Sequence, residues 1–178
     1  SSTSRGLGDV YKRQILFHLK YVLFQNLRVK EFKLKKKPSN RSEYNFFSKI
    51  STRWNDNDIY GHMNNIVYYA LFDTAVNKWL IQNDLIDIKL GKNIGLIVQS
   101  GCNYFSSFQY PEEIDAGIRV TKIGTSSVRY EVGLFHEKDE ISSADGFFIH
   151  VYVDRETNTP IALNYDFKKT LDTIFVDL

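Results

Sequence analysis

Residues 66–81 (IVYYALFDTAVNKWLI) are the feature that most limits how this chain can fold. They predict a helix of about 24 Å, at a rise of 1.5 Å per residue. Asn64 or Asn65 is expected to cap its start, and Asn83 to stop it. Its polar side chains are few: Asp73, Thr74, Asn77 and Lys78. Because the apolar surface covers most of the circumference, we expect this helix to be surrounded by protein.

Strands account for most of the remaining pattern. One is expected before the helix, at 47–54, with Ile50, Thr52 and Trp54 on one face. Four are expected after it, at 95–105, 114–123, 126–136 and 147–153, followed by a short helix at 166–175. The alternation is clearest in the middle two, where the inward sets are Ile114, Ala116, Ile118 and Val120, then Val128, Tyr130, Val132 and Leu134. Consecutive strands with short turns predict an α+β domain in which an antiparallel sheet wraps the apolar helix.

Charge divides the chain into two parts. Residues 1–41 hold eleven basic side chains against Asp9 and Glu31, a net charge of +9, whereas residues 42–178 carry a net charge of −7. We expect residues 1–41 to be a basic extension, disordered or not native to the protein, and residues 42–178 to be the folded domain. The run KLKKK at 33–37 is typical of contacts with nucleic acid or anionic lipid, but a solvated extension is the favoured interpretation, and no nucleic-acid partner is expected.

The composition also bears on the compartment. A single cysteine, Cys102, excludes an internal disulfide and indicates a reducing environment. No apolar run reaches the roughly 18 residues of a membrane-spanning helix. These features predict a cytoplasmic protein, with the mitochondrial matrix as the alternative. Cys102 lies among aromatic residues on a predicted strand, which favours a packing role over a nucleophilic one.

The segment just before the helix, 55–65 (NDNDIYGHMNN), has the composition of a loop. Asp58 precedes the helix by a few residues, so its carboxylate is expected near the first-turn amides, where the positive dipole end favours the ionised form. Asp56 is expected to bind backbone amides instead. A calcium loop is rejected because its twelfth position would be Val67 rather than Glu. A metal held by Asp56, Asp58 and His62 is the weaker alternative, and none is predicted.

Several motifs resemble those of one family, in the family's order. Arg53–Tyr69 (RWNDNDIYGHMNNIVYY) resembles the signature R-W-x-D-x-D-x-x-G-H-x-N-N-x-x-Y of the hotdog-fold acyl-CoA thioesterases of the 4-hydroxybenzoyl-CoA thioesterase-like branch. Similar stretches follow at Cys102–Pro111, Ile114–Gly117, Val120–Leu134 and Val151–Pro160. The resemblance implies a hotdog fold with a long central helix, hydrolysis of an acyl-CoA to a carboxylic acid and free CoA, no cofactor, and assembly as a homodimer or homotetramer.

The same resemblance implies roles for individual residues. Asp58 is the implied catalytic carboxylate, either nucleophile or general base, with helix N-terminal amides polarising the thioester carbonyl. His62 and Asn65 are implied as further catalytic residues. The implied substrate-binding residues are Gly61, Tyr68, Gly124, Ser126, Ser127 and Arg129, the last of which is able to meet a CoA phosphate.

Each of these residues also has a purely structural interpretation. Asp58 and Gly61 suit a tight turn, Asn65 a helix cap, and residues 124–127 a hairpin turn. His62 suits a hydrogen-bonded loop position. A rival function of a different class therefore stays open: a non-catalytic acyl-CoA-binding or sensing module on the same fold.

Overall fold

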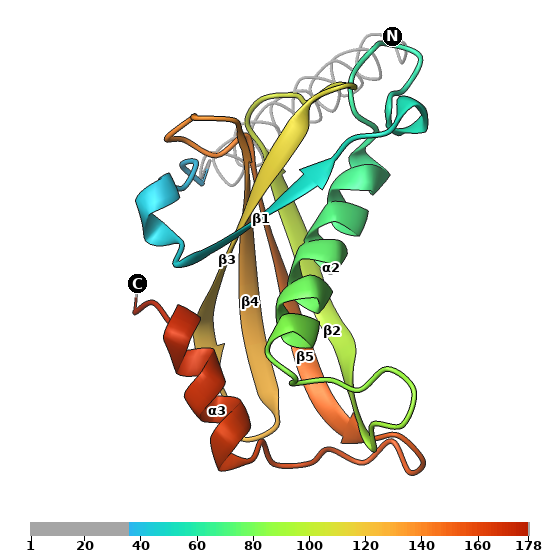
Figure 1. The fold of residues 1–178 in the computed structure, drawn as a ribbon, viewed down its shortest axis with the longest axis vertical. Helices are drawn as coiled ribbons and strands as arrows, with labels where there is room; N and C mark the ends of the chain where they lie inside the picture. The colour runs from blue at the N-terminus through green and yellow to red at the C-terminus, as the bar shows by residue number, and fades with distance from the viewer. Residues whose placement is uncertain (1–35, 178) are drawn as a thin grey trace, which may run out of the picture. The chain divides into compact units, whose positions relative to one another are not determined.

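A computed structural model of the chain describes residues 36–177, and its elements follow the predicted order (Figure 1). The strand β1 (Phe46–Ser51) precedes the helix α2 (Asn65–Gln82). Four strands follow, and these are β2 (Asn93–Tyr104), β3 (Glu113–Ile123), β4 (Ser127–His136) and β5 (Ala144–Asp154). The helix α3 (Tyr165–Leu171) comes last, and three 3₁₀ turns complete the set, η1 (Arg41–Glu43), η2 (Trp54–Asp56) and η3 (Asp172–Ile174).

The five strands form one sheet in the order β1-β3-β4-β5-β2, and every neighbouring pair is antiparallel. The predicted antiparallel sheet is confirmed. Because β2 pairs only with β5 among the described residues, it forms one edge of the sheet. It is twelve residues long, against six for the other edge strand, β1.

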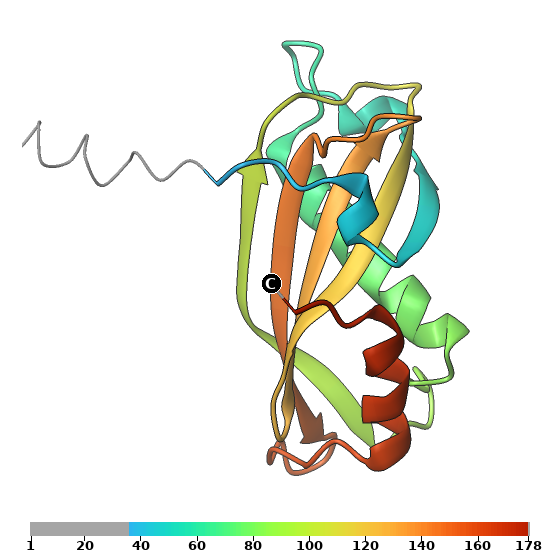
Figure 2. The ribbon, with the colours of Figure 1, turned by 90° about the vertical axis from the view of Figure 1, so that its left-hand side faces the viewer.

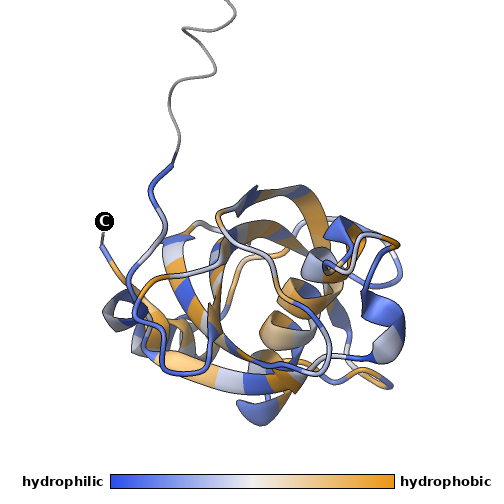
Figure 3. Cartoon of the chain, turned by 90° about the horizontal axis from the view of Figure 1, so that it is seen from above, coloured by the Kyte–Doolittle hydropathy of each residue, from blue (hydrophilic) through white to orange (hydrophobic). Residues whose placement is uncertain are grey.

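One face of the sheet packs against α2 (Figures 1 and 2). Seen from above, the sheet curves around one side of this helix (Figure 3). The predicted inward sets of β3 and β4 are all buried, at 0–1% exposure, so the period-two pattern identified the core face correctly. Gly146 on β5 lies against the Phe72 ring, where a larger side chain would collide with it. Leu171 and Ile174 join the same core from the C-terminal segment.

The expectation that α2 would be covered on all sides is wrong within the described residues. Its buried side chains form one face, whereas Ile66 is 72% exposed and Ile81 45% exposed. The helix has 18 residues, a modest length. The reason is geometric: a single curved sheet covers one side of a cylinder, and apolar residues on the outer side stay accessible.

The first strand is also shorter than predicted. It ends at Ser51, and Trp54 lies in η2 with 77% of its surface exposed, its ring packing against Tyr110. The turn forms because the Asp56 carboxylate accepts a 2.7 Å hydrogen bond from the backbone amide of Arg53. This local side-chain hydrogen bond forms in place of further strand pairing, so β1 ends before Trp54.

The domain begins earlier than the charge pattern indicated. The compact unit starts at Pro38 rather than at residue 42. Ser39 donates from its hydroxyl to Asp145 at 2.8 Å, and Arg41 pairs with Asp115 at 3.0 Å. Figure 2 shows η1 crossing the sheet face opposite α2. Residues 38–41, assigned to the extension on charge alone, therefore belong to the folded unit. The expectation for residues 1–35 falls outside the described part of the chain.

Among residues 36–177, no helix combines the length and the apolar character needed to cross a membrane.

Candidate active site

Asp58 lies at the centre of a tight loop between η2 and α2. Its Oδ1 accepts hydrogen bonds from the backbone amides of Tyr60, at 2.8 Å, and His62, at 3.2 Å. Its own amide donates to the His62 carbonyl at 2.7 Å. Gly61 closes the turn with a φ of 80°, a conformation that glycine adopts without steric cost, as its predicted turn role requires.

The two carboxylate oxygens of Asp58 have different surroundings. The sequence predicted that Asp58 would lie near the amides of the first turn of α2. The amides that bind it belong instead to its own loop. The other carboxylate oxygen, Oδ2, accepts no hydrogen bond from any described residue. Asp58 therefore orders the loop with one oxygen and keeps the other available, so the structural and catalytic interpretations are compatible.

Asp56 is fully engaged, as predicted for a structural carboxylate. It is 2% exposed, and its two oxygens bind the backbone amide of Arg53 and the Arg53 guanidinium, the latter at 2.9 and 3.1 Å. Its carbonyl accepts from the amide of Asn64 at 2.8 Å. Asp56 thus fixes the loop to the start of α2. Within residues 36–177, no three His, Cys, Asp or Glu side chains gather as metal ligands.

The start of α2 separates the roles of the two asparagines. Asn64 is the N-cap, and its Oδ1 accepts from the amide of Ile66 at 3.1 Å. Asn65 is the first helical residue and is exposed. Its backbone amide donates to no acceptor in the described part of the chain, because Asn64 serves the amides of Ile66 and Val67. A free first-turn amide is suited to polarise a carbonyl oxygen.

A cavity of about 310 Å³ opens beside this helix start. Met63, Asn65 and Tyr68 line it from the loop and α2, and Tyr104, Ser106 and Ser107 line it from the end of β2 and the segment after it. The Tyr68 and Tyr104 rings meet edge to face, with centroids 4.9 Å apart. Burial raises the pKa of both phenols, so both hydroxyls stay protonated at neutral pH.

Of the residues implied by the resemblance, Asn65 and Tyr68 line this cavity, whereas Asp58, Gly61 and His62 lie on the loop that leads into α2. The His62 side chain is exposed on the same loop. Tyr104, Ser106 and Ser107 were not singled out in the sequence, although they fall within the Cys102–Pro111 motif. Burial raises the pKa of Cys102 to about 11, so this thiol remains protonated, in keeping with its predicted packing role.

The second implied group, Gly124, Ser126, Ser127 and Arg129, lies elsewhere. The start of β3 is paired with the end of β1, close to the Asp58 loop, whereas the β3–β4 turn lies at the far end of β3. At about 3.3 Å per residue, these ends are roughly 33 Å apart. Figure 1 shows the turn at the opposite end of the sheet. One chain does not bring the two groups together.

The turn group is itself well ordered. The Gly124 amide donates to the Ser127 carbonyl at 2.7 Å, which closes the predicted hairpin turn. The Arg129 guanidinium lies 3.9 Å from the centroid of the Phe147 ring, and its Nε donates to Glu131 at 3.0 Å. The side chain is partly exposed, so Arg129 is held in one orientation with some of its donors accessible.

Comparison with known proteins identifies the class to which this fold and site belong. The sequence pattern of the thioesterase-like superfamily matches residues 52–171, and the chain belongs to that family. Its architecture is the hotdog fold, as the motifs indicated.

Three similar proteins illustrate the range of this likeness. The PA5185 protein from Pseudomonas aeruginosa strain PAO1 is 46% identical, with a TM-score of 0.75, covering 79% of this chain and 97% of that one. Slr0204, a 1,4-dihydroxy-2-naphthoyl-CoA thioesterase from Synechocystis, shares the fold at 13% identity and a TM-score of 0.65, covering 71% of this chain and 95% of that one. YsmA of Bacillus subtilis (strain 168), an uncharacterized protein, is 21% identical over 74% of this chain and 88% of its own length.

Proposed function

We propose that this protein is an acyl-CoA thioesterase that hydrolyses its substrate to a carboxylic acid and free CoA. The observation that carries the proposal is the state of Asp58: Oδ1 is held by two loop amides while Oδ2 has no partner among the described residues. A held carboxylate with a free oxygen can attack a thioester carbonyl or deprotonate a water molecule. Membership of the thioesterase-like superfamily supports the same reaction.

In this proposal one group polarises the thioester carbonyl and another attacks it or activates water. The free amide of Asn65 donates to the carbonyl oxygen as negative charge develops on it. Asp58 acts as nucleophile or as general base, and both roles fit its geometry. The cavity lined by Tyr68 and Tyr104 receives the part of the acyl group nearest the thioester. His62, which is exposed on the loop, is the proposed residue that assists water or the leaving thiolate.

In this proposal a second copy of the chain completes the acyl-CoA binding site. The turn group around Arg129 is roughly 33 Å from the Asp58 loop along β3. If both groups serve one acyl-CoA, they come from different chains, so we propose a homodimer as the minimum assembly. The long β2 edge, with Leu96, Ile97 and Val98 exposed by 42–61%, is the proposed contact surface.

A pair of matched substitutions tests the catalytic proposal. Asp58→Asn keeps Oδ1 as an acceptor for the loop amides but removes the charge, so kcat is expected to fall by about 100- to 10,000-fold with little change in Tm. Asp56→Asn weakens the contact with Arg53 and is expected to lower Tm more than Asp58→Asn while reducing kcat less. Thiol release from the best acyl-CoA measures kcat, and circular dichroism monitors folding.

Two outcomes would contradict the proposal. A folded Asp58→Asn protein within about threefold of the wild-type kcat would show that Asp58 is structural, since threefold corresponds to only about 0.65 kcal/mol. Binding of acyl-CoAs without thiol release from any member of a panel would favour the rival function, a non-catalytic acyl-CoA-binding or sensing module.

A further inference from the structure

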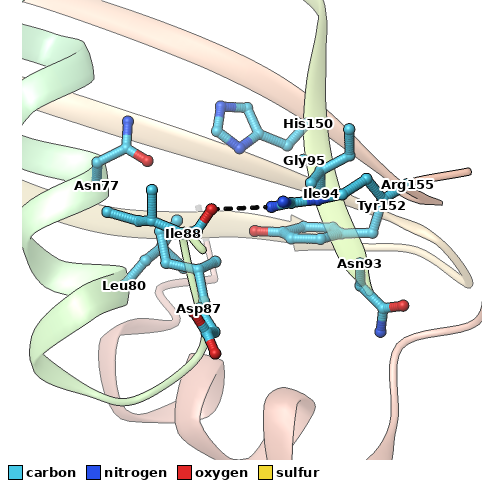
Figure 4. Close-up of a pocket in the computed structure, with 11 residues that line it drawn as sticks. Asn77, Leu80, Asp87, Ile88, Asn93, Ile94, Gly95, His150, Tyr152 and Arg155 are labelled. Atoms are coloured by element: carbon cyan, nitrogen blue, oxygen red, sulfur yellow. Dashed lines mark hydrogen bonds between the residues drawn. The ribbon is translucent and has the colours of Figure 1, made fainter. Parts of the chain in front are cut away.

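A second cavity, of about 200 Å³, lies near the other end of α2 (Figure 4). It is bounded by the C-terminal half of α2, by the segment from residue 86 to the start of β2, and by β5. Its apolar walls come from Leu80, Ile86, Ile88 and Ile94, with the Tyr152 ring beside them. Asn77 enters this cavity from α2, twelve residues after Asn65, so roughly 18 Å of helix separate it from the cavity beside Asp58.

One buried polar side chain in this cavity has no partner. His150 on β5 is 4% exposed, and neither of its ring nitrogens has a hydrogen-bond partner among the described residues. The hydroxyls of Tyr130 and Tyr152, which flank it, bind each other at 2.8 Å instead. On β2, Ile97 pairs in register with His150, and the neighbouring Gly95 leaves room beside the imidazole, because a Cβ there would lie 3.0 Å from Nδ1. Buried polar groups without partners are rare in folded proteins, and this one faces a cavity.

The protonation state of His150 defines what it can bind. Burial lowers its pKa from 6.5 to about 4, so the ring is neutral at pH 7. A neutral imidazole offers one N–H donor and one nitrogen acceptor. A hydroxyl group can donate to the bare ring nitrogen or accept from the ring N–H, so it can bind whichever nitrogen faces the cavity, whereas a cation or an anion could bind only one of the two.

The charged side chains around the cavity form hydrogen bonds with backbone groups of the segment that bounds it. The Arg155 guanidinium donates to the carbonyls of Ile88, at 3.1 Å, and Lys89, at 3.4 Å, and Figure 4 draws the bond to Ile88 as a dashed line. Asp87 accepts from the amides of Lys89 and Leu90 at 2.9 and 3.0 Å. Because these charges hold the 86–92 segment in place, they favour a preformed pocket for a neutral ligand.

We propose that this cavity is a binding site for a small neutral molecule that is mostly apolar and carries a hydroxyl group, of about the size of phenol. The hydroxyl binds the imidazole of His150, and the ring or chain packs against the aliphatic wall. The size follows from the volume, since an apolar protein cavity of about 150 Å³ accommodates benzene. The site is separate from the Asp58 loop, and this inference goes beyond thioester hydrolysis.

Titration of the full chain with phenol and with toluene tests the proposal by calorimetry. The two probes match in size, but only phenol carries the hydroxyl. We expect phenol to bind at least about fivefold more tightly than toluene to the wild-type protein. His150→Phe, which replaces one buried ring by another without its nitrogens, is expected to abolish that preference while leaving toluene affinity within about twofold. The matched control His136→Phe, on β4, is expected to leave both affinities unchanged.

A second measurement covers the case in which His150→Phe fails to fold. The chain has four histidines, so ring nitrogen-15 spectra of the wild-type protein can be assigned by substituting the other three in turn. Phenol is expected to shift a ring nitrogen of His150 with the same saturation as the calorimetric titration. The proposal is overturned if phenol shows no saturable binding below about 10 mM. It is equally overturned if His150→Phe retains the phenol preference, or if the His150 ring signals do not move.

Discussion

Two aspartates that are only two positions apart in sequence have opposite environments in this protein. Asp56 is buried with both oxygens bound to Arg53, whereas Asp58 is bound by loop amides through one oxygen alone. A fully satisfied carboxylate contributes to the structure of the loop, and one with a free oxygen can react. This difference at the level of single atoms is what makes Asp58 the candidate and Asp56 its control.

The buried His150 makes a separate prediction about pH and stability. Its pKa falls from 6.5 to about 4 on folding, so between these values the unfolded chain binds a proton that the folded chain does not. The free energy of unfolding is therefore expected to decrease as the pH falls from 6.5 towards 4. The loss assigned to this residue is about 3 kcal/mol at pH 4.

Urea unfolding at pH 7 and at pH 4.5 measures this effect, with His150→Phe as the reference. The carboxylates that titrate in the same window are common to both proteins, so the difference between them isolates the histidine. The variant is expected to lose less stability than the wild type on acidification. Equal losses would mean that the imidazole accepts its proton in the folded state as readily as in the unfolded state.

Local hydrogen bonds of single residues could be predicted from the sequence, whereas contacts between distant elements could not. The turn at Gly61 and the cap at Asn64 were predictable because each depends on a local hydrogen-bond or backbone requirement. The free oxygen of Asp58 and the unpartnered ring of His150 were not, because they depend on which residues from distant elements fail to reach them. His150 sits on the core face of β5 between Phe148 and Tyr152, where the alternation alone marks it as an ordinary inward position.

At the scale of elements, the start of α2 carries the second half of the proposed chemistry. The N1 residue of a helix is a favourable place for proline, whose missing N–H has no intrahelical partner in any case. Asn64, the preceding residue, already has the extended φ and ψ of −62° and 136° that a following proline requires. Asn65→Pro therefore removes the proposed donor amide with the helix intact.

We expect Asn65→Pro to reduce kcat by about 100- to 1,000-fold, the usual effect of losing one oxyanion donor. Asn65→Ala is the control, because it removes the side chain and keeps the amide. Its kcat reports any contribution of the Asn65 side chain, and the further loss on going to proline reports the amide. If the two variants have the same kcat and similar circular dichroism spectra, the amide does not take part in the reaction.

The β2 edge gives the element-scale prediction about assembly. Val98 is 61% exposed at the register shift of a long edge strand, so its side chain is accessible on the proposed contact surface. Val98→Lys is expected to convert a dimer into a monomer, because lysine blunts edge-to-edge pairing. Light scattering at micromolar concentration measures the change, with Lys122→Ala on β3 as a control at an exposed site away from this edge. A wild-type monomer under these conditions would contradict the proposed dimer.

Elements were more predictable than their ends. The strands and both helices lie where hydrophobic periodicity predicted them, since burial of one face determines both. The first strand failed at its end because the bond between Asp56 and the Arg53 amide outweighs the continuation of the pattern to Trp54. The exposure of Ile66 on α2 was likewise not predictable, since composition does not tell which side of a helix the sheet leaves open.

At the scale of the whole molecule, net charge misplaced the start of the domain. Basic residues before position 42 look alike in sequence, yet Arg41 lies against the folded unit. Its guanidinium pairs with Asp115 and lies 4.9 Å from the Phe135 ring centroid, on the sheet face opposite α2. A charged side chain that packs on an aromatic ring is part of the structure as well as of the charge pattern.

Two truncated proteins, beginning at Pro38 and at Ser42, test where the domain starts. They differ only by residues 38–41, so the difference between them reports the contacts of Ser39 and Arg41 together with those of Asn40. The shorter protein loses the hydrogen bonds of Ser39 to Asp145 and Ser142 as well as the Arg41 contacts. These are worth about 2–4 kcal/mol together, given the usual net value of buried and charged hydrogen bonds. For a domain of this size, Tm is then expected to be lower by roughly 5–15 °C in the protein that begins at Ser42.

Differential scanning calorimetry provides the comparison, and Arg41→Leu in the longer protein is expected to reproduce part of the loss. Equal Tm values would return the boundary to residue 42, as the charge pattern indicated, and would mean that the contacts of residues 38–41 do not contribute to the folded state.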